Sequence, residues 1–552
     1  MPMFFRKVTS RSGGKEYTYL KLIENYREGN KVKQRVIANL GNLENLTPEK
    51  VEGLIDGLAR ICGVSRRPAS IEAKKVLRYG EVLAIHRIWE MLDVGGAVEA
   101  AFSGERYDPD TALLLELMAI NQIINPPNKQ AISEWYRCLY FPEAQGKEFL
   151  DHHFYRALDS VAGVKERLEE ELFQRLCAFT RVSREVAFCL LTTATVEPAP
   201  RSDLEHSPYG RYILQSPLEE QLVYLGILVS REGMPFGHRI LHEVPDEGDF
   251  REIVHHLEAA HGTRQCIFVG DRRLVATPHL EVLMSHGYHY LVRRKVQSEW
   301  ELRLCERELV ENRAEFIEVD ESLWYREVVE GGVRYLVCYS PAAAREKMIA
   351  LAERLDEVEE ELRKLQKAVA PENRSGRRTL PRGAAILKDK YCRRYFDWHY
   401  SEATGELTWR RKEDVITREK KTAGAFLLET NAPLLDGREL LLAYTRLGQL
   451  GESFEEIRSF ETRPKEFYRE RNLSASIFVC VLAAMLEKTL EGLLRRAGIP
   501  LTSRQALELL EEVKVAINRV DDVELKSVTS IEKTQEEILQ AIGVPDPRAV
   551  VV

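Results

Sequence analysis

Residues 186–193 read VAFCLLTT, an apolar run of the length of a β-strand. Two similar runs follow, QLVYLGILV at 221–229 and MPFGHRILH at 234–242, and the turn Arg231-Glu232-Gly233 separates them. Short apolar runs that are bounded by turn residues predict buried strands. We therefore expect three strands in hairpin order in this part of the chain.

The chain then changes to an alternation of helices and strands. A helical pattern at 249–262 precedes the short apolar strand Cys266–Gly270, which ends at Asp271. A second helical stretch at about 277–287 precedes the strand Tyr288–Val292. Three strands in hairpin order, then helix, strand, helix and strand, is the element order of an RNase H-like α/β core. We expect residues 183–300 to form its first part.

The core pattern is interrupted and then resumes. Residues 301–430 contain strand-like pieces, a charged helix and a basic segment, and we expect them to form a long insertion. Helices from about Glu439 to Ser459 and from Ala475 to Leu494 then predict that residues 431–500 complete the core. Residues 501–552 are expected to form a helical tail.

A small β meander is expected at the start of the chain. Runs at 4–9, 17–24 and 32–39 have strand character, and the turns SGGK and REGN separate them. Thr47 can cap a helix in which Pro48 occupies the first turn. We therefore assign residues 1–65 to a basic meander plus one helix.

Residues 66–182 have a helical pattern from about residue 72. We expect breaks at Gly95-Gly96, Ser103-Gly104 and Asn125-Pro126-Pro127, because glycine and proline interrupt helices. The expected product is an all-α domain that binds DNA.

Length and composition bound the class of protein. A chain of 552 residues is too long for one compact core, and 44% hydrophobic with 30% charged residues is a globular balance. No stretch of eighteen apolar residues lacks charges, so we expect no membrane span. The nine cysteines form no CxxC pair, which signals neither a zinc site nor a disulfide framework. We expect reduced thiols and a cytoplasmic location.

Charge is locally basic although the net charge is −8. Residues 1–41 carry nine basic and three acidic side chains, or +6, and residues 373–395 carry eight and one, or +7. Contact with phosphates needs such local concentrations, whereas a solvated surface is the alternative reading. The candidate DNA-binding side chains are Arg6, Lys7, Lys31, Lys33, Arg35, Arg374, Arg377, Arg378, Arg382, Arg393 and Arg394.

The charged helix of the insertion has an apolar seam. Its members alternate spacings of three and four residues, which gives three heptads with apolar a and d positions. They are Met348, Leu351, Leu355, Val358, Leu362, Leu365 and Val369. Such a seam either dimerises or folds back on its own domain, and the spacing does not decide between the two.

Several short motifs occur in order along the chain. They are Asn121, Asn125-Pro126, Lys129, Glu134-Trp135, Tyr155–Asp159, Leu225-Gly226, Arg231-Glu232-Gly233, Val269–Arg272, Leu427–Asn431 and Arg463-Pro464. Their order and spacing resemble the DDE transposases of bacterial insertion sequences, in the IS-four group and its sixteen-thirty-four branch. The resemblance spans about residues 4–545.

This resemblance implies a specific chemistry. In such enzymes three carboxylates hold two divalent ions, Mg²⁺ or Mn²⁺, which activate the attacking oxygen and stabilise the leaving oxygen at a phosphodiester. Magnesium demands oxygen ligands in near-octahedral geometry. The family also implies duplex DNA as the partner and a homo-oligomer on DNA, because two element ends must be brought together.

The family's acidic positions are only partly retained. Asp271 matches the second acid, with a helix N-cap as its alternative role. Leu190 stands where the first acid belongs, and leucine cannot ligate a metal. The third acid belongs to a helical pattern that starts at Tyr444, whose later positions hold Gly451 in place of the acid and Arg458 in place of lysine. Asp271 is then the one metal ligand left if a site survives.

Neighbouring acids could substitute only after a shift. Glu452 is one helical step, about 100°, from Gly451, and Glu455 lies about 6 Å further along the axis. Glu197 is an odd number of residues from Leu190, so it faces the other side of the sheet. We expect a DNA-binding transposase relative with impaired catalysis. An active enzyme with displaced carboxylates and a non-catalytic assembly or regulatory protein are the alternatives.

Overall fold

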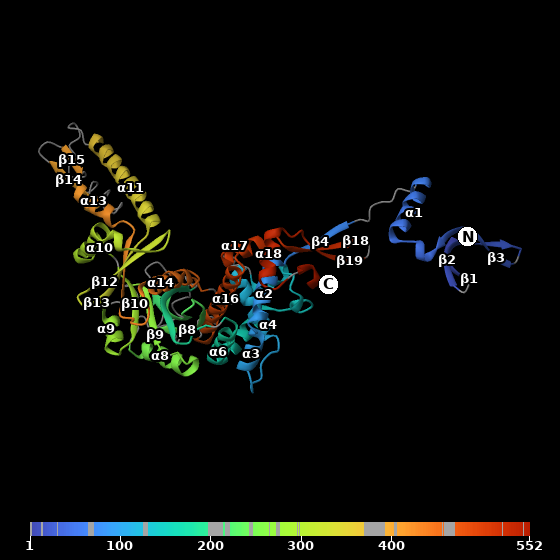
Figure 1. The fold of residues 1–552 in the computed structure, drawn as a ribbon, viewed down its shortest axis with the longest axis horizontal. Coiled ribbons are helices and arrows are strands. Elements are labelled where there is room, and N and C mark those ends of the chain that lie inside the picture. Colours follow the sequence, from blue (N-terminus) through green and yellow to red (C-terminus); the bar gives the residue numbers. More distant parts are fainter. Residues whose placement is uncertain are drawn as a thin grey trace. The chain divides into compact units, whose positions relative to one another are not determined.

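The computed structural model shows a chain of two compact units, Met1–Lys75 with Ile517–Leu525, and Val76–Ala516 with Lys526–Val552 (Figure 1). The structure describes residues 3–12, 15–29, 31–63, 71–124, 131–180, 182–196, 213–215, 221–241, 247–263, 265–271, 277–294, 296, 298–368, 392–401, 406–454, 456–457, 470–520, 523–544 and 546–551.

The first unit contains the predicted meander and helix. Its elements are β1 (Met3–Ser12), β2 (Lys15–Glu28), β3 (Lys31–Asn42) and α1 (Pro48–Ile61). The strands pair antiparallel in the order β1-β2-β3. The Thr47 hydroxyl accepts a hydrogen bond from the Lys50 backbone N–H at 3.4 Å, so it caps α1 as expected.

An eleven-stranded sheet forms the centre of the second unit. Its first strands are β5 (Val186–Val196), β6 (Ile213–Gln215), β7 (Gln221–Ser230), β8 (Pro235–Leu241), β9 (Gln265–Asp271) and β10 (His289–Arg294). The helices α8 (Glu247–His261) and α9 (Thr277–Ser285) connect the last three of them. The strands and helices predicted between residues 186 and 292 therefore occur in the predicted order, and β6 is an additional strand that was not predicted.

The strand directions follow from the connections. β5 pairs antiparallel with β7, and β7 pairs antiparallel with β8, as hairpin order requires. β9 and β10 return parallel to β5 after helical crossovers. The rest of the sheet continues from β10 through β16 (Ala425–Thr430), β13 (Val333–Tyr339), β12 (Leu323–Glu330) and β11 (Ile317–Asp320). The insertion thus extends the sheet, and β12 was not predicted.

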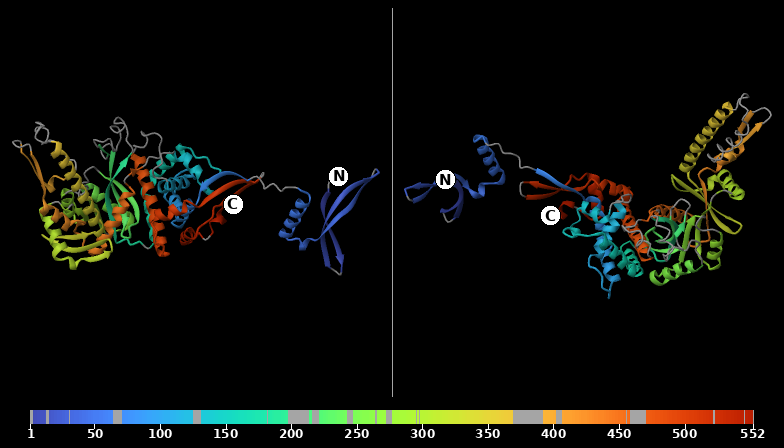
Figure 2. Two further views of the ribbon diagram at one scale, coloured as in Figure 1. Left: turned by 90° about the horizontal axis from the view of Figure 1, so that it is seen from above. Right: turned by 180° about the vertical axis from the view of Figure 1, so that it is seen from behind.

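A helical layer packs beside this sheet. Its members are α2 (Gly80–Met91), α3 (Val94–Ala101), α4 (Thr111–Ile124), α5 (Ile132–Trp135), α6 (Asp151–Thr180), α16 (Glu470–Arg496), α17 (Ser503–Leu510) and α18 (Lys533–Ala541). α16 packs against α2, α4, α6 and α17 and also against β8, so it joins the helical layer to the sheet (Figure 2).

The helix α16 is long and apolar enough to cross a membrane by composition alone. Its stretch Leu473–Arg496 contains an 18-residue window of mean hydropathy 1.7. However, 83% of that window is buried inside the protein. Such burial is the property of a core helix, and no other described helix passes the same test.

Three expectations for the flanking regions are wrong. Residues 71–78 form a strand, β4 (Ile71–Arg78), where helix was expected. The tail also contains β18 (Lys514–Val520) and β19 (Val523–Val528), and the three strands pair in the order β19-β18-β4. β4 and β18 lie far apart in sequence, so no local pattern revealed their pairing. Gly95-Gly96 lies inside α3 and does not break it. A glycine suits position 96, because a Cβ there would come within 2.5 Å of the Asp93 carboxylate.

The apolar seam of the insertion is buried within the chain. It lies on α11 (Pro341–Ala368), which packs against β14 (Phe396–Ser401), β15 (Glu406–Arg411) and α13 (Glu413–Thr422). Leu355 and Leu362 are 3% and 0% exposed and share a core cluster with Phe396 and Leu407. The seam folds back on its own domain; its last member, Val369, lies outside the described residues. α10 (Glu299–Glu311) precedes these elements.

The predicted helix at 439–459 is shorter than expected. α14 spans Gly437–Glu452 and begins at a capping box formed by Asp436 and Glu439. Beyond its end, the Phe454 side chain is fully buried and β17 (Glu456–Ile457) pairs in parallel with β5. Pairing with the sheet ends the helix seven residues before the predicted boundary.

Candidate functional site

The candidate site lies where β5 and β9 run side by side. Leu190 on β5 is the register partner of Val269 on β9, and Asp271 is the last residue of β9. The backbone at Asp271 is therefore two residues beyond the neighbour of Leu190, at the carboxyl end of its strand. Open α/β sheets place ligands at such ends. The side chain of Asp271 lies outside what the structure describes.

The helix α14 brings Gly451 to the same place. A Cβ built on Gly451 would lie 3.7 Å from Cδ2 of Leu190 and 4.0 Å from Oγ1 of Thr192. Both distances are ordinary van der Waals contacts. Positions 190 and 451 are therefore close together in the structure, although they are 261 residues apart in the chain.

The surroundings of Leu190 are apolar. Its side chain is 6% exposed and belongs to the core cluster that includes Val269, Leu447, Leu450 and Phe454. A hydrated cation loses its solvation in such surroundings without gaining ligands. The residues at positions 190 and 451 do not fit a divalent metal site, and in the described part of the chain no group of three or more His, Cys, Asp or Glu side chains could hold one.

The remaining candidates around the site are scattered. The Tyr444 ring packs against the same core cluster and lies 6.4 Å from the ring of Phe426. Glu452 is exposed at the last position of α14. Glu197, Glu455 and Arg458 lie outside the described residues. The structure thus brings 190 and 451 together and leaves Glu452 in solvent.

The basic residues of the meander divide between the two faces of the sheet. Arg6 donates a hydrogen bond to Oε1 of Gln34 at 3.0 Å, so these two side chains share a face. Strand alternation then puts Lys33, Arg35 and their neighbour Lys31 on the opposite face. Lys7 follows Arg6 directly and also faces that side. We call Lys7, Lys31, Lys33 and Arg35, all exposed, the basic face.

Part of the basic face is neutralised within the protein. Arg35 pairs with Glu24 at 2.6 Å, and Lys33 pairs with Glu28. Exposed ion pairs of this kind contribute little stability, so their cations can exchange a carboxylate for a phosphate at low cost. Lys7 and Lys31 extend the same surface beyond these pairs.

Most of the second basic segment, residues 373–395, lies outside the described residues. Four of its candidate arginines are among the residues outside: Arg374, Arg377, Arg378 and Arg382. Arg393 and Arg394 are described and exposed. Arg394 pairs with Glu419 at 3.1 Å and lies over the ring of Tyr395, so it also contacts its own domain.

Two charged clusters lie in the helical layer, away from the candidate site. Glu169 on α6 is fully buried and accepts hydrogen bonds from Nη1 of Arg239 at 3.1 Å and from the His238 backbone at 3.0 Å. Burial alone would raise the pKa of Glu169, but Lys165, His238 and Arg239 together hold it well below its usual range. This network fixes α6 to β8.

The second charged cluster surrounds His86 on α2. Its Nδ1 lies 2.7 Å from Oε1 of Glu116, and its Nε2 lies 3.4 Å from Oε1 of Glu143. Burial lowers the pKa of His86, but these two carboxylates outweigh it and raise the pKa to about 10. The cluster holds α2, α4 and the segment after α5 together.

Comparison with known families gives one match. Residues 5–69 match the family described as IS1634 family transposase, N-terminal domain. The matched part contains the meander and α1. A search of curated proteins found no match to the chain. The matched family is the sixteen-thirty-four branch that the sequence motifs resemble.

Proposed function

We propose that this insertion-sequence transposase of the IS1634 branch binds duplex DNA and has impaired metal-dependent cleavage. The observation that carries the proposal is that position 451 lies beside Leu190, which is buried in an apolar cluster. By the family resemblance these positions should hold two of three acids. They hold leucine and glycine.

The arrangement of strands supports an RNase H-like scaffold. The order β8-β7-β5-β9-β10, with three antiparallel strands followed by two parallel ones, is the order that such a core requires. Asp271 ends β9 beside β5, and α14 delivers position 451 to β5. This arrangement supports a shared site for the three positions of the family's acidic set, 190, 271 and 451.

The site has too few carboxylate ligands for metal-dependent cleavage. Two divalent cations held about 3.5–4 Å apart need several carboxylates to compensate their charge. Asp271 alone leaves most of that charge uncompensated. Loss of a metal-based stabilisation worth several kcal/mol lowers a rate by many powers of ten. Magnesium or manganese would act at this site only if displaced acids such as Glu452 moved into it.

The basic face supports DNA binding. Its four cations lie on one side of a small sheet, in a chain whose net charge is −8. Local clusters of Lys and Arg bind phosphates by releasing counterions, which makes affinity fall steeply with salt. We further propose a cytoplasmic homo-oligomer on DNA. The α11 seam does not supply its contact, because the seam is buried within one chain.

A cleavage assay tests the proposal. The unmodified protein is incubated with duplexes that carry the ends of its own element and with Mg²⁺ or Mn²⁺, and we expect no cleavage above background. The variants Asp271→Ala and Glu452→Gln serve as controls. Robust cleavage that either control abolishes would show that displaced acids complete the site, and the proposal of an impaired centre would be wrong.

A further inference from the structure

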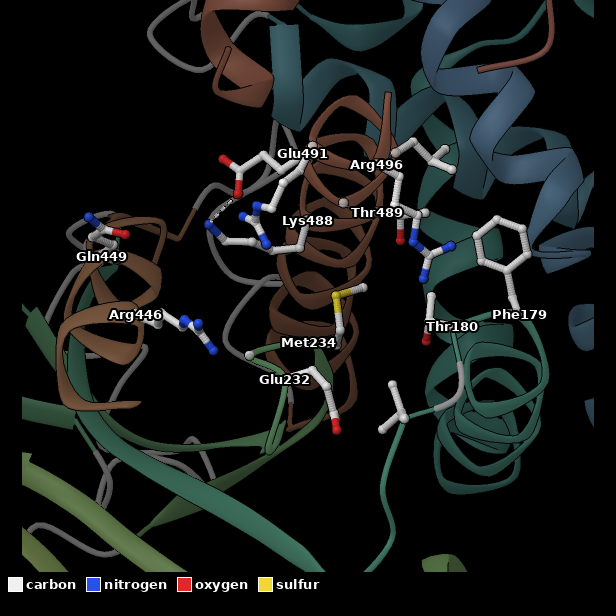
Figure 3. Close-up of a pocket in the computed structure, with 15 residues that line it drawn as sticks. Phe179, Thr180, Glu232, Met234, Arg446, Gln449, Lys488, Thr489, Glu491 and Arg496 are labelled. Atoms are coloured by element: carbon white, nitrogen blue, oxygen red, sulfur yellow. Dashed lines mark hydrogen bonds and ion pairs between the residues drawn. The ribbon is translucent and has the colours of Figure 1, made fainter. Parts of the chain in front are cut away.

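A pocket lies in the second unit, on the side of α14 away from the core. Its cavity of about 290 Å³ is formed by the end of α6, the turn between β7 and β8, α14 and α16. Figure 3 shows Arg446 reaching in from α14 and Arg496 lying near Phe179 and Thr180. The sequence analysis did not predict this pocket, because its residues come from separate segments that only the fold brings together.

The lining of the pocket has an excess of positive charge. Its charged side chains are Arg446, Lys488, Arg495 and Arg496 against Glu232 and Glu491, a balance of four to two. Lys488 pairs with Glu491 at 2.9 Å, which neutralises both. Three arginines and Glu232 remain.

The guanidinium groups of the three arginines have no partner among the residues that the structure describes. Within the described part of the chain, the side chains of Arg446, Arg495 and Arg496 make no hydrogen bond or ion pair, and all three residues are exposed. Glu232 already accepts a hydrogen bond from the Ser183 backbone N–H at 3.2 Å. The cations are therefore available to an anion from outside.

We propose that this pocket binds a phosphate group, and that in the working protein the group is a phosphodiester of the DNA backbone. The second part rests on the proposed function. Guanidinium groups match phosphate because their planar donors bind two oxygens at once. The cavity is at the small end of the size range of ligand sites, which suits one phosphate with its flanking sugars.

Helix dipoles are a competing explanation for the cations. α6 ends at Thr180 and α16 ends at Arg496, so both helix C-termini lie at the pocket. Each terminus carries about half a negative charge. Together they offset about one of the three arginines, and Glu232 offsets another. A net positive charge remains in the cavity.

The test measures the salt dependence of duplex DNA binding. The variant Arg446→Gln with Arg496→Gln should reduce the slope of log affinity against log salt by about 0.9, the value for one phosphate. Gln449→Glu should do the same, because it places a carboxylate at the pocket without removing a side chain. The matched control is Arg303→Gln, a 73% exposed arginine of α10, which should leave the slope unchanged.

A second arm uses inorganic phosphate as the probe and thermal unfolding as the readout. Phosphate should raise the Tm of the unmodified protein, and the pocket variants should lose this effect. The proposed phosphate site would be wrong if the pocket variants kept both the salt dependence of DNA affinity and the increase in Tm on adding phosphate. If the unmodified protein binds no DNA but responds to phosphate through these arginines, the site stands with free phosphate as its ligand, and the proposed DNA function fails.

Discussion

Restoring the first acid should destabilise the protein before it restores any chemistry. Leu190→Asp removes a 6% exposed side chain from the core cluster. Truncation of a buried leucine costs about 2–5 kcal/mol, and an unpaired buried carboxylate adds to that cost. We expect a loss of about 4 kcal/mol, which at roughly 2 °C per kcal/mol in a large cooperative unit lowers Tm by about 8 °C.

The pH dependence of this loss identifies its cause. Burial raises the pKa of the new carboxyl group above its value in the unfolded chain. The penalty is therefore small at low pH, where the group is protonated in both states, and grows as pH rises through the unfolded pKa. Scanning calorimetry at pH 5 and pH 8 checks this, with the volume-conserving Leu190→Met as the control.

Gly451 gives the matched contrast. A Cβ there meets only ordinary contacts at 3.7 and 4.0 Å, so Gly451→Ala should raise stability by roughly 0.5–1 kcal/mol. Two results would refute the reasoning. Leu190→Asp with an unchanged Tm would show that Leu190 is not core, and an increase in the Tm of Leu190→Asp/Gly451→Glu on adding Mg²⁺ would show that a metal site can still form there.

Three further outcomes are expected. Leu355→Asp with Leu362→Asp should lower Tm without changing the mass found by light scattering, because the seam packs within the chain; a smaller mass would show an intermolecular seam. The pKa of about 10 for His86 predicts stability that falls as pH rises from about 6.5 to 10, and His86→Gln should flatten this dependence in calorimetry. Lys7→Glu with Lys31→Glu should flatten the salt dependence of DNA affinity measured by fluorescence anisotropy; an unchanged slope would exclude the basic face from DNA contact.

The sheet was predictable because its strands are apolar and its partners follow in sequence. Runs such as VAFCLLTT and CIFVG are recognisable as buried strands from their length and composition. β4 is not, because it is rich in polar residues and its partner β18 lies more than 400 residues away. Pairing of that kind is set by tertiary contact, which local patterns do not contain.

The candidate site shows the same limit. The sequence indicated positions 190, 271 and 451 as candidates, and the structure adds that a side chain at 451 would lie against Leu190. The end of α14 could not be predicted from the sequence, because the residues beyond Glu452 keep a helical pattern. In the structure Phe454 is buried in the core just after the helix ends. The seam of α11 was recognised by its period, but a period indicates which side chains are buried and not which chain buries them.

The position of α16 has a consequence for synthesis of the protein. α4 and α6 pack against this helix, yet it is translated about 290 residues after α6 ends. At 5–20 residues per second, that interval lasts roughly 15–60 s. Throughout it, the apolar faces of α4 and α6 are on a nascent chain without their partner. The helical layer therefore completes its core only near the end of translation.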